Sequence, residues 1–375
     1  MKKVTFIVVS TDPTTGLGRM VTNIARELNQ KGVTVNFISE SECSEFPTTV
    51  TKLRGHSVFR PISLLKTLRT LRSISNTSDA VVCFDVRPAG IMGAFGVIGT
   101  RTPLSVHALG TYSLYFKGGS FSSKLKNILL WRVYRLCTNI FIINEYVQDA
   151  IERSGSHKYV FDGLPVTYVP VGVDVNEFTK STEKYRDLSE PYILTVGAFK
   201  ERKGQLKTLQ AFKKVSTKFP NLQYVLVGSG QHDLYTAGCK EYIVENGLSN
   251  KVIILEQVSD RELIQLYSHA EIFIMAPTET EYAIEGFGMV YIEAALCGTP
   301  SIGTYGSGAE AAIVDNETGI LTENTPDALA GSLVKILGDN HLREHFAHTA
   351  RKRAKTFSWE HVANQYCDIL ELTKI

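Results

Sequence analysis

The chain has 375 residues, more than one hydrophobic core normally organises, so two domains of similar size are expected. Hydrophobic residues make up 43% and charged residues 21%, a composition that excludes disordered and fibrous proteins. The net charge of +2 is divided unevenly, because residues 1–185 hold 22 Lys and Arg against 14 Asp and Glu, whereas the remainder holds 18 against 24. The two halves therefore present surfaces of opposite net charge, +8 and −6.

Neither a disulfide scaffold, a zinc module nor a membrane span is predicted. The six cysteines are scattered and form no C-x-x-C pair, which favours a reducing, cytoplasmic compartment. No apolar run approaches the roughly 18 residues that cross a membrane. The opening Met1–Ser10 resembles a signal peptide, but its apolar stretch is short and polar Thr11-Asp12-Pro13 follows, so we interpret it as a buried strand.

Short apolar runs alternate with amphipathic segments along the first half. A helix is predicted over Met20–Gln30, where apolar residues recur on one face. This alternation predicts right-handed crossovers and a parallel sheet covered on both faces. The predicted strands are Val4–Ser10, Val33–Ser39, Ala80–Phe84, Leu104–His107 and Asn139–Asn144.

A polar, non-periodic stretch over 179–190 predicts a linker, and a second series of the same kind follows it. The sequence thus predicts an α/β protein with two Rossmann-like domains facing across a cleft, and ligands at the carboxyl ends of the strands that line it. The second-half strands are predicted over Tyr192–Gly197, Tyr224–Gly228, Val252–Leu255 and Ile272–Ala276, and the helices over Gln205–Lys218, Leu234–Asn246, Arg261–His269 and Met289–Cys297.

Two short glycine-containing segments suit phosphate binding. Gly16 and Gly18 open the first helix, where helix amides can meet an anion. The third glycine of a dinucleotide fingerprint is missing, so a turn alone explains them equally well. Arg202 and Lys203 follow the first strand of the second half and suit a diphosphate, the alternative being a solvated basic turn.

The segment from Glu285 to Pro300 is more specific. It follows a buried strand, places Gly286 and Gly288 at a helix start, and ends the helix at a glycine before a proline. Glu285 and Glu293 lie about 12 Å apart by helical rise, beyond the roughly 5–9.5 Å that separates paired glycosidase carboxylates. We interpret the two glutamates as binding two different parts of an elongated ligand. The alternative is that Glu293 is a surface residue of the helix and that Glu285 interacts only with the helix dipole.

Together and in this order, these segments resemble the family 4 glycosyltransferases, retaining sugar-nucleotide enzymes of the GT-B fold. Glu285–Glu293 is similar to that family's Glu-x7-Glu motif. Val169–Asp174 with Phe178 is similar to its I-P-N-G-V-D-x-x-x-F signature, with valine in place of the asparagine. Further segments in the expected order are Val225–Gly230, Val258–Asp260, Gly306–Glu310 and Phe357–Glu360. The resemblance implies an acceptor-binding domain over 1–183, a donor-binding domain over 184–355, and a last helix over 356–375 that packs back on the first domain.

The resemblance also implies roles for individual residues. Glu285 is expected to contact the donor sugar, Glu293 the ribose, and Lys203 the phosphates. His107 takes the place of the family histidine near the reacting carbon, although a lone histidine at a strand end is more often a buried core residue. The remaining donor contacts are expected at Gly16, with Gly18 beside it, at Val258 for the nucleobase, and at Gly286, Phe287, Gly288, Met289 and Val290 for the diphosphate.

The sequence departs from the family pattern at two places. Ala198 stands where the family usually has an arginine, and we expect Arg202 to supply the missing charge. Extra residues over Thr278–Ile284 precede Glu285, beside the expected donor pocket. Both departures concern the identity of the donor rather than the fold.

The expected reaction is retaining transfer of a hexosyl unit from a UDP- or GDP-sugar to a hydroxyl of a saccharide or lipid-linked acceptor, in cell-surface polysaccharide or glycolipid synthesis. No Asp-x-Asp motif or metal-spaced cluster is present, so no cofactor and no metal are expected, nor is a nucleic-acid partner. A nicotinamide-dependent oxidoreductase is the alternative enzyme, disfavoured by the incomplete glycine loop. A non-catalytic, two-lobed sugar-binding protein would leave Arg202, Lys203 and Glu285 without a role.

Two basic segments, Arg60–Arg72 and Lys117–Arg135, concentrate the positive charge of the first half. One interpretation is that both are helices packed on the sheet by their leucines, with the cations in water. The other is that they rest on an anionic membrane surface and bring a lipid-linked acceptor to the enzyme, which would then be peripheral on the cytoplasmic face.

Overall fold

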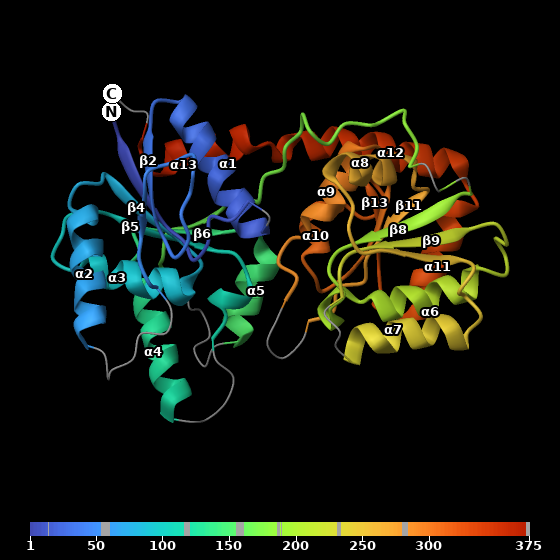
Figure 1. The fold of residues 1–375 in the computed structure, drawn as a ribbon, viewed down its shortest axis with the longest axis horizontal. Coiled ribbons are helices and arrows are strands. Elements are labelled where there is room, and N and C mark those ends of the chain that lie inside the picture. The colour runs from blue at the N-terminus through green and yellow to red at the C-terminus, as the bar shows by residue number, and fades with distance from the viewer. Residues whose placement is uncertain are drawn as a thin grey trace. The chain divides into compact units, whose positions relative to one another are not determined.

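The structure is a computed structural model of the chain, and it describes residues 1–13, 15–53, 61–115, 121–154, 161–185, 188, 190–230, 234–279 and 284–372. Its contacts divide the chain into two compact units (Figure 1). The first unit comprises Met1–Gly172 and Trp359–Ile375, and the second comprises Val173–Ser358. Each unit is built on one parallel sheet with helices packed against it, as the alternation of apolar runs and amphipathic segments predicts.

The first unit contains a seven-stranded sheet in the order β3-β2-β1-β4-β5-β6-β7, with every neighbouring pair parallel. Its central strands are buried along their length, which explains why they appear in the sequence as continuous apolar runs. The strands are β1 (Lys3–Ile7), β2 (Thr34–Ser39), β3 (Thr48–Val50), β4 (Ala80–Phe84), β5 (Leu104–Ala108), β6 (Asn139–Ile142) and β7 (Val166–Tyr168).

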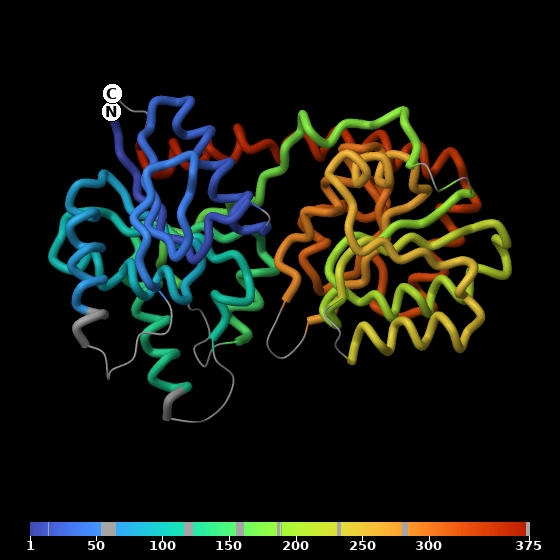
Figure 2. The backbone as a smooth tube through the Cα atoms, in the orientation of Figure 1, coloured from blue at the N-terminus to red at the C-terminus, as the bar shows by residue number. Residues whose placement is uncertain are grey.

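Helices of the first unit come from both ends of the chain. Helix α1 buries the face predicted for it, including Val21, Ile24 and Leu28. The C-terminal helix α13 packs beside α1, and the two are seen side by side in blue and red in Figure 2. The helices are α1 (Gly16–Gln30), α2 (Pro61–Ser75), α3 (Ile91–Val97), α4 (Phe121–Leu136), α5 (Glu145–Ser154) and α13 (Trp359–Ile369), with short turns η1 (Val86–Gly90) and η2 (Thr111–Ser113).

The second unit contains a six-stranded parallel sheet in the order β10-β9-β8-β11-β12-β13. Leu209, Phe212, Leu329 and Leu333 from flanking helices pack in its core. The strands are β8 (Tyr192–Val196), β9 (Gln223–Val227), β10 (Val252–Leu255), β11 (Ile272–Ile274), β12 (Ser301–Thr304) and β13 (Gly319–Thr322). The helices are α6 (Gln205–Val215), α7 (Leu234–Glu245), α8 (Asp260–His269), α9 (Met289–Leu296), α10 (Ala309–Ala312), α11 (Pro326–Leu337) and α12 (Asn340–Ala354), with turns η3 (Glu201–Lys203) and η4 (Lys355–Phe357).

The two segments by which the chain passes between the units run side by side. Val173 donates its amide to the carbonyl of Phe357 at 2.8 Å and forms a β-bridge with Ser358. A Cβ atom on Gly172 would lie 2.3 Å from the ring of Trp359, so only glycine fits there. The glycine of the Val-Pro-Val-Gly-Val-Asp signature therefore has a packing role at this crossing.

The boundary between the units falls at Gly172 and Val173, whereas the resemblance placed it at 183–184. The intervening residues pack on the second unit. The ring of Phe178 contacts that of Tyr267, with centroids 6.3 Å apart. The amide of Ser181 donates to Ser268 Oγ at 2.9 Å. The polar composition of this stretch predicted a linker because it gives no sign of these contacts.

None of the helices in the described ranges combines the length and the hydropathy that a membrane crossing requires.

Candidate functional site

The second sheet reverses its strand order between β8 and β11. From β8 the chain adds β9 and β10 on one side, and then β11, β12 and β13 on the other. The loops after β8 and β11 therefore leave the carboxyl edge on opposite sides of this point, where open parallel sheets bind their ligands. Arg202 and Lys203 lie in the first loop, and Glu285 lies in the second.

These three side chains meet. Lys203 donates from Nζ to Glu285 Oε1 at 2.8 Å, and Arg202 donates from Nη1 to Glu285 Oε2. Glu285 is only 8% exposed, whereas the two cations are half-buried. The group carries one positive charge in excess, because two cations share one carboxylate. It can therefore accept an anion beside the glutamate.

The environment keeps Glu285 ionised. Burial raises the pKa of its carboxyl, but the charges of Lys203 and Arg202 and their hydrogen bonds outweigh burial, so the pKa is lowered overall. Glu285 is thus a hydrogen-bond acceptor that holds the two cations in place. Its free lone pairs can accept a ligand hydroxyl.

Two glycines allow the loops to approach each other. Gly204 has φ +73°, and a Cβ atom on it would lie 1.9 Å from the carbonyl oxygen of Ala276, just after β11. Its absence of a side chain lets the Arg202–Lys203 turn lie against that loop, where Thr278 donates to the carbonyl of Arg202 at 2.9 Å. Gly308 similarly donates its amide to the carbonyl of Glu285 at 3.0 Å. The loop that follows β12 therefore supports the backbone of Glu285.

The predicted diphosphate-binding residues lie at the start of α9. Gly288 is the N-cap with φ +75°, and helix geometry leaves the first amides of the helix without intrahelical partners. Phe287 is buried against Phe357, with ring centroids 5.5 Å apart, so its side chain serves packing. Met289 and Val290 are half-buried in the first turn. This helix start directly follows Glu285. Its first amides and the excess positive charge of Arg202 and Lys203 can therefore bind the same anion.

Glu293 is buried in the second turn of α9 rather than lying on the surface. Tyr267 of α8 donates its hydroxyl to Glu293 Oε2 at 2.9 Å. Burial and the neighbouring Glu293 both raise the pKa of Tyr267, so its hydroxyl stays protonated and donates. The two glutamates thus bond to different side chains of the protein, Glu285 to two cations and Glu293 to Tyr267. Tyr267 was missed by the sequence analysis, because it is indistinguishable there from other core aromatics.

Val258 lies at the same carboxyl edge, between β10 and α8, and is half-buried. The next residue, Ser259, is the N-cap of α8 and forms a capping box with Glu262. The capping box fixes the backbone around Val258. The structure thus brings Arg202, Lys203 and Glu285 into contact and places Val258 on the sheet edge that they share.

Gly16 and Gly18 lie at the start of α1 in the first unit. Gly18 donates its amide to Oγ1 of the N-cap Thr15 at 3.0 Å. A Cβ atom on Gly18 would lie 1.9 Å from the carbonyl oxygen of Asp12. The geometry therefore gives Gly18 a role in the turn and does not support its predicted ligand contact. Gly16 is exposed and remains a candidate.

His107 is a buried core residue, and its predicted catalytic role is not supported by this geometry. Its side chain is fully buried in the first unit. Nδ1 lies 2.6 Å from the hydroxyl of Tyr366, and Nε2 lies 3.1 Å from the carbonyl oxygen of Val169. Both ring nitrogens are therefore occupied, and burial lowers the pKa of the imidazole to about 3. The resemblance favoured a catalytic role for His107 over that of an ordinary buried core histidine. The structure fits the buried core histidine.

A pH experiment tests this environment. The folded pKa lies below the roughly 6.5 of an unfolded histidine, so stability from neutral His107 is present above pH 6.5 and is lost as pH falls toward about 3. Between pH 8 and pH 5, the wild type should lose about 2 kcal/mol of unfolding free energy that His107→Gln does not lose. Both tryptophans, Trp131 and Trp359, belong to the first unit, so their fluorescence during urea unfolding reports on it. Equal pH dependence in both proteins would contradict a neutral buried imidazole.

Asp85 is a candidate functional residue that the sequence analysis missed. It follows β4, beside the point where the first sheet reverses its strand order between β1 and β4. It is buried, with φ +67°, a region that few non-glycine residues adopt. Burial raises its pKa to about 6, although bonds from Ser113 and the amide of Leu109, and the charge of Arg87, lower it. The signal that the sequence offered for this residue was an aspartate directly after a predicted buried strand.

Among the described residues, no three His, Cys, Asp or Glu side chains lie close enough together to hold a metal ion. All six cysteines lie in the described part of the chain and none of them forms a disulfide, and all except Cys43 are buried. Burial raises the pKa of Cys83 and Cys137, so these thiols are protonated core residues. The described cysteines therefore add no reactive thiol to the candidate site.

Comparison with known proteins covers nearly the whole chain. A model described as Glycosyltransferase Family 4 matches residues 14–177, and one described as Glycosyl transferases group 1 matches residues 177–353. The D-inositol 3-phosphate glycosyltransferase of Corynebacterium urealyticum is 30% identical over 247 residues, which cover 62% of this chain and 56% of that protein. A GDP-mannose-dependent monoacylated alpha-(1-6)-phosphatidylinositol monomannoside mannosyltransferase of Corynebacterium glutamicum is 29% identical over 253 residues, 63% of this chain and 64% of that protein.

The chain thus spans between about half and two thirds of the length of these two relatives. Among solved structures, that of Anabaena HepE in complex with UDP-glucose superposes with a TM-score of 0.77 at 18% identity, over 99% of this chain and 100% of that chain. The family models match both halves of the sequence, and each unit has the expected parallel-sheet architecture. The chain therefore belongs to the family 4 glycosyltransferases and has the GT-B fold.

Proposed function

We propose that the protein transfers a hexosyl unit from a nucleotide-diphosphate sugar to an acceptor hydroxyl, with retention of configuration. The observation that carries the proposal is the buried Glu285 held between Lys203 and Arg202 at the reversal point of the second sheet. The donor class, a UDP- or GDP-sugar, is supported by the UDP-glucose in the HepE structure and by the GDP-mannose in the name of the mannosyltransferase relative.

In this reaction negative charge develops on the leaving diphosphate as the anomeric bond breaks. Lys203, Arg202 and the first amides of α9 stabilise that charge, and Glu285 keeps the two cations in position before the donor binds. Fixed donors aimed at developing charge are commonly the largest catalytic contribution. Glu285 also accepts a sugar hydroxyl, and Glu293, oriented by Tyr267, accepts the ribose hydroxyls. The cations supply the countercharge, so the proposed reaction has no metal requirement.

For the acceptor we propose a saccharide or a lipid-linked saccharide, in the synthesis of a cell-surface polysaccharide or glycolipid. Support comes from the relatives, one named for an inositol phosphate and the other for a phosphatidylinositol mannoside. The excess of cations in the first half suits a phosphate-bearing acceptor of this kind. A cytoplasmic enzyme, peripheral on the membrane, follows from the same proposal.

The test is a panel of donors that pairs UDP and GDP with glucose, galactose and mannose. We expect one nucleotide sugar to release its nucleoside diphosphate faster in the presence of an acceptor extract, and excess chelator to leave the rate unchanged. Strict dependence on added magnesium or manganese would refute the metal-free mechanism. Turnover of a nicotinamide cofactor in place of nucleotide release would favour the oxidoreductase, and binding without turnover would favour a sugar-binding protein.

A further inference from the structure

Helix α4 of the first unit has two apolar faces. One face packs inward through Leu130, Val133 and Tyr134, all of which are buried. On the other, Leu125, Leu129 and Leu136 share a stripe with Ile128 and Arg132, because these positions recur at intervals of three or four residues. One of the two interpretations of this segment had its leucines packed on the sheet and its cations in water. Leu130 is packed in that way, but a second stripe of large apolar side chains is exposed.

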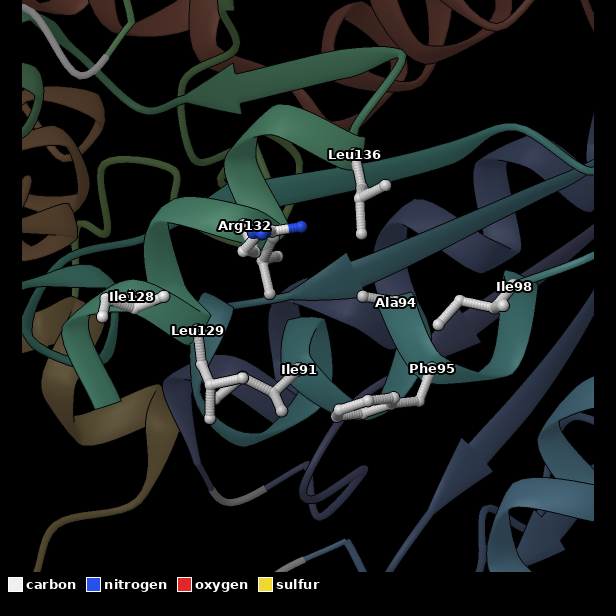
Figure 3. Close-up of a pocket in the computed structure, with 9 residues that line it drawn as sticks. Ile91, Ala94, Phe95, Ile98, Ile128, Leu129, Arg132 and Leu136 are labelled. Atoms are coloured by element: carbon white, nitrogen blue, oxygen red, sulfur yellow. The ribbon is translucent and has the colours of Figure 1, made fainter. Parts of the chain in front are cut away.

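Helix α3 forms the other wall of a groove with this stripe. Phe95 and Ile98, the latter just beyond its last turn, are exposed like the apolar stripe of α4, and all six large side chains are between 36% and 53% exposed. Figure 3 shows side chains of both helices projecting into the space between them. The groove has a volume of about 340 Å³. Single exposed apolar residues are ordinary, but a contiguous patch over a groove marks a binding surface.

The surroundings of this α3–α4 groove are positively charged. Among the described residues that line it, Arg132 carries the only charge, and no carboxylate in the described part of the chain pairs with it. The guanidinium of Arg72 lies beside Gly99, next to Ile98, at 2.9 Å from the place that a Cβ atom on this glycine would take. Residues 86–144 contain seven Lys and Arg and no Asp or Glu. The groove is therefore lined by apolar side chains, and it lies in a part of the sequence whose charged residues are all positive.

We propose that the α3–α4 groove takes an acyl chain of an anionic phospholipid and thereby docks the first unit on an anionic membrane surface. The apolar walls suit a hydrocarbon chain, and Arg132 at the same stripe suits the phosphate of its headgroup. A second copy of this chain is a poor occupant, because a symmetric contact would bring the like-charged segments together. The proposal is independent of the donor site, which lies in the other unit.

The first experiment measures co-sedimentation of the whole protein with phosphatidylcholine vesicles that contain or lack phosphatidylglycerol. We expect binding to the anionic vesicles at about 0.1 M salt and weaker binding at about 1 M, where the Debye length falls from roughly 10 Å to roughly 3 Å. Pure phosphatidylcholine should retain little protein. A wild type that ignores anionic vesicles at the lower salt concentration overturns the proposal.

Charge-neutral variants separate chain binding from simple charge attraction. Ile128→Asn combined with Leu129→Asn should weaken binding by at least about tenfold, because each exposed side chain loses apolar burial in the bilayer. Arg132→Gln should weaken binding to anionic vesicles about fivefold, the effect of one cation near such a surface. The matched controls are Val244→Asn and Lys352→Gln, exposed positions of the second unit that should bind as the wild type does.

Two further results would overturn the proposal. If the Ile128/Leu129 variant binds anionic vesicles like the wild type, the attraction is electrostatic and the groove is not used. If the wild type self-associates in sedimentation velocity, ignores vesicles, and loses self-association in that variant, the occupant is a second copy. Circular dichroism establishes folding of each variant. Nucleoside-diphosphate binding, measured without vesicles, shows whether the donor site is intact, so failure here is distinct from failure of the proposed activity.

Discussion

Replacing Lys203 with alanine is expected to lower turnover by roughly 10²–10³, the usual cost of removing one preorganised donor to developing charge. Lys203 bonds to the buried Glu285, so its ammonium is held in place before the donor arrives. The variant should still fold, because Glu285 keeps its bond to Arg202. The measurement is the rate of nucleoside-diphosphate release at saturating donor, with substrate affinity determined separately.

The neighbouring Lys200→Ala is the matched control. Lys200 is an exposed cation three residues earlier in the same turn, and its removal should leave turnover close to that of the wild type. If both variants lose activity equally, the turn acts through its general charge and not through one positioned group. Full turnover by Lys203→Ala would contradict the assignment of this site as the one that stabilises the leaving diphosphate.

The second large effect concerns Arg202 and the unusual Ala198. Arg202 bonds to Glu285, so it is a fixed member of the site and not a solvated surface cation. Arg202→Ala should reduce turnover by roughly 10² for the same electrostatic reason as at Lys203. The side chain of Ala198 is exposed, so an arginine can be introduced there without repacking the core. Ala198→Arg in the Arg202→Ala background should therefore recover part of the lost activity.

The control for this pair is Arg261→Ala, which removes an exposed arginine paired with an exposed glutamate, Glu183. It should have little effect on turnover, since surface ion pairs contribute little. A silent Arg202→Ala would mean that the leaving group depends on Lys203 and the α9 amides alone. A large loss without any rescue by Ala198→Arg would instead mean that the position of the guanidinium matters more than its charge.

The sequence by itself determined the alternation of strands and helices in both units. Strands β4 and β10 have the predicted limits. Strand β4 is fully buried, and such parallel strands appear as unbroken apolar runs; β10 is a half-buried edge strand, but its residues also form an unbroken apolar run between polar neighbours. Lys203 and Glu285 could be placed at one sheet edge, because carboxyl ends of parallel strands share an edge. Short strands such as β3 and β7, of three residues each, carry too little pattern to be predicted.

Only the tertiary structure decided the environment of individual side chains. His107 is neutral and buried because Tyr366, 259 residues away in the sequence, closes over it, and local sequence carries no record of such a contact. Glu293 is likewise held by Tyr267 on another helix. Helix α4 shows the same limit, since periodicity reveals apolar residues at helical spacing but not which of two apolar faces meets the sheet. Burial is decided by which elements pack together, and that choice depends on the whole fold.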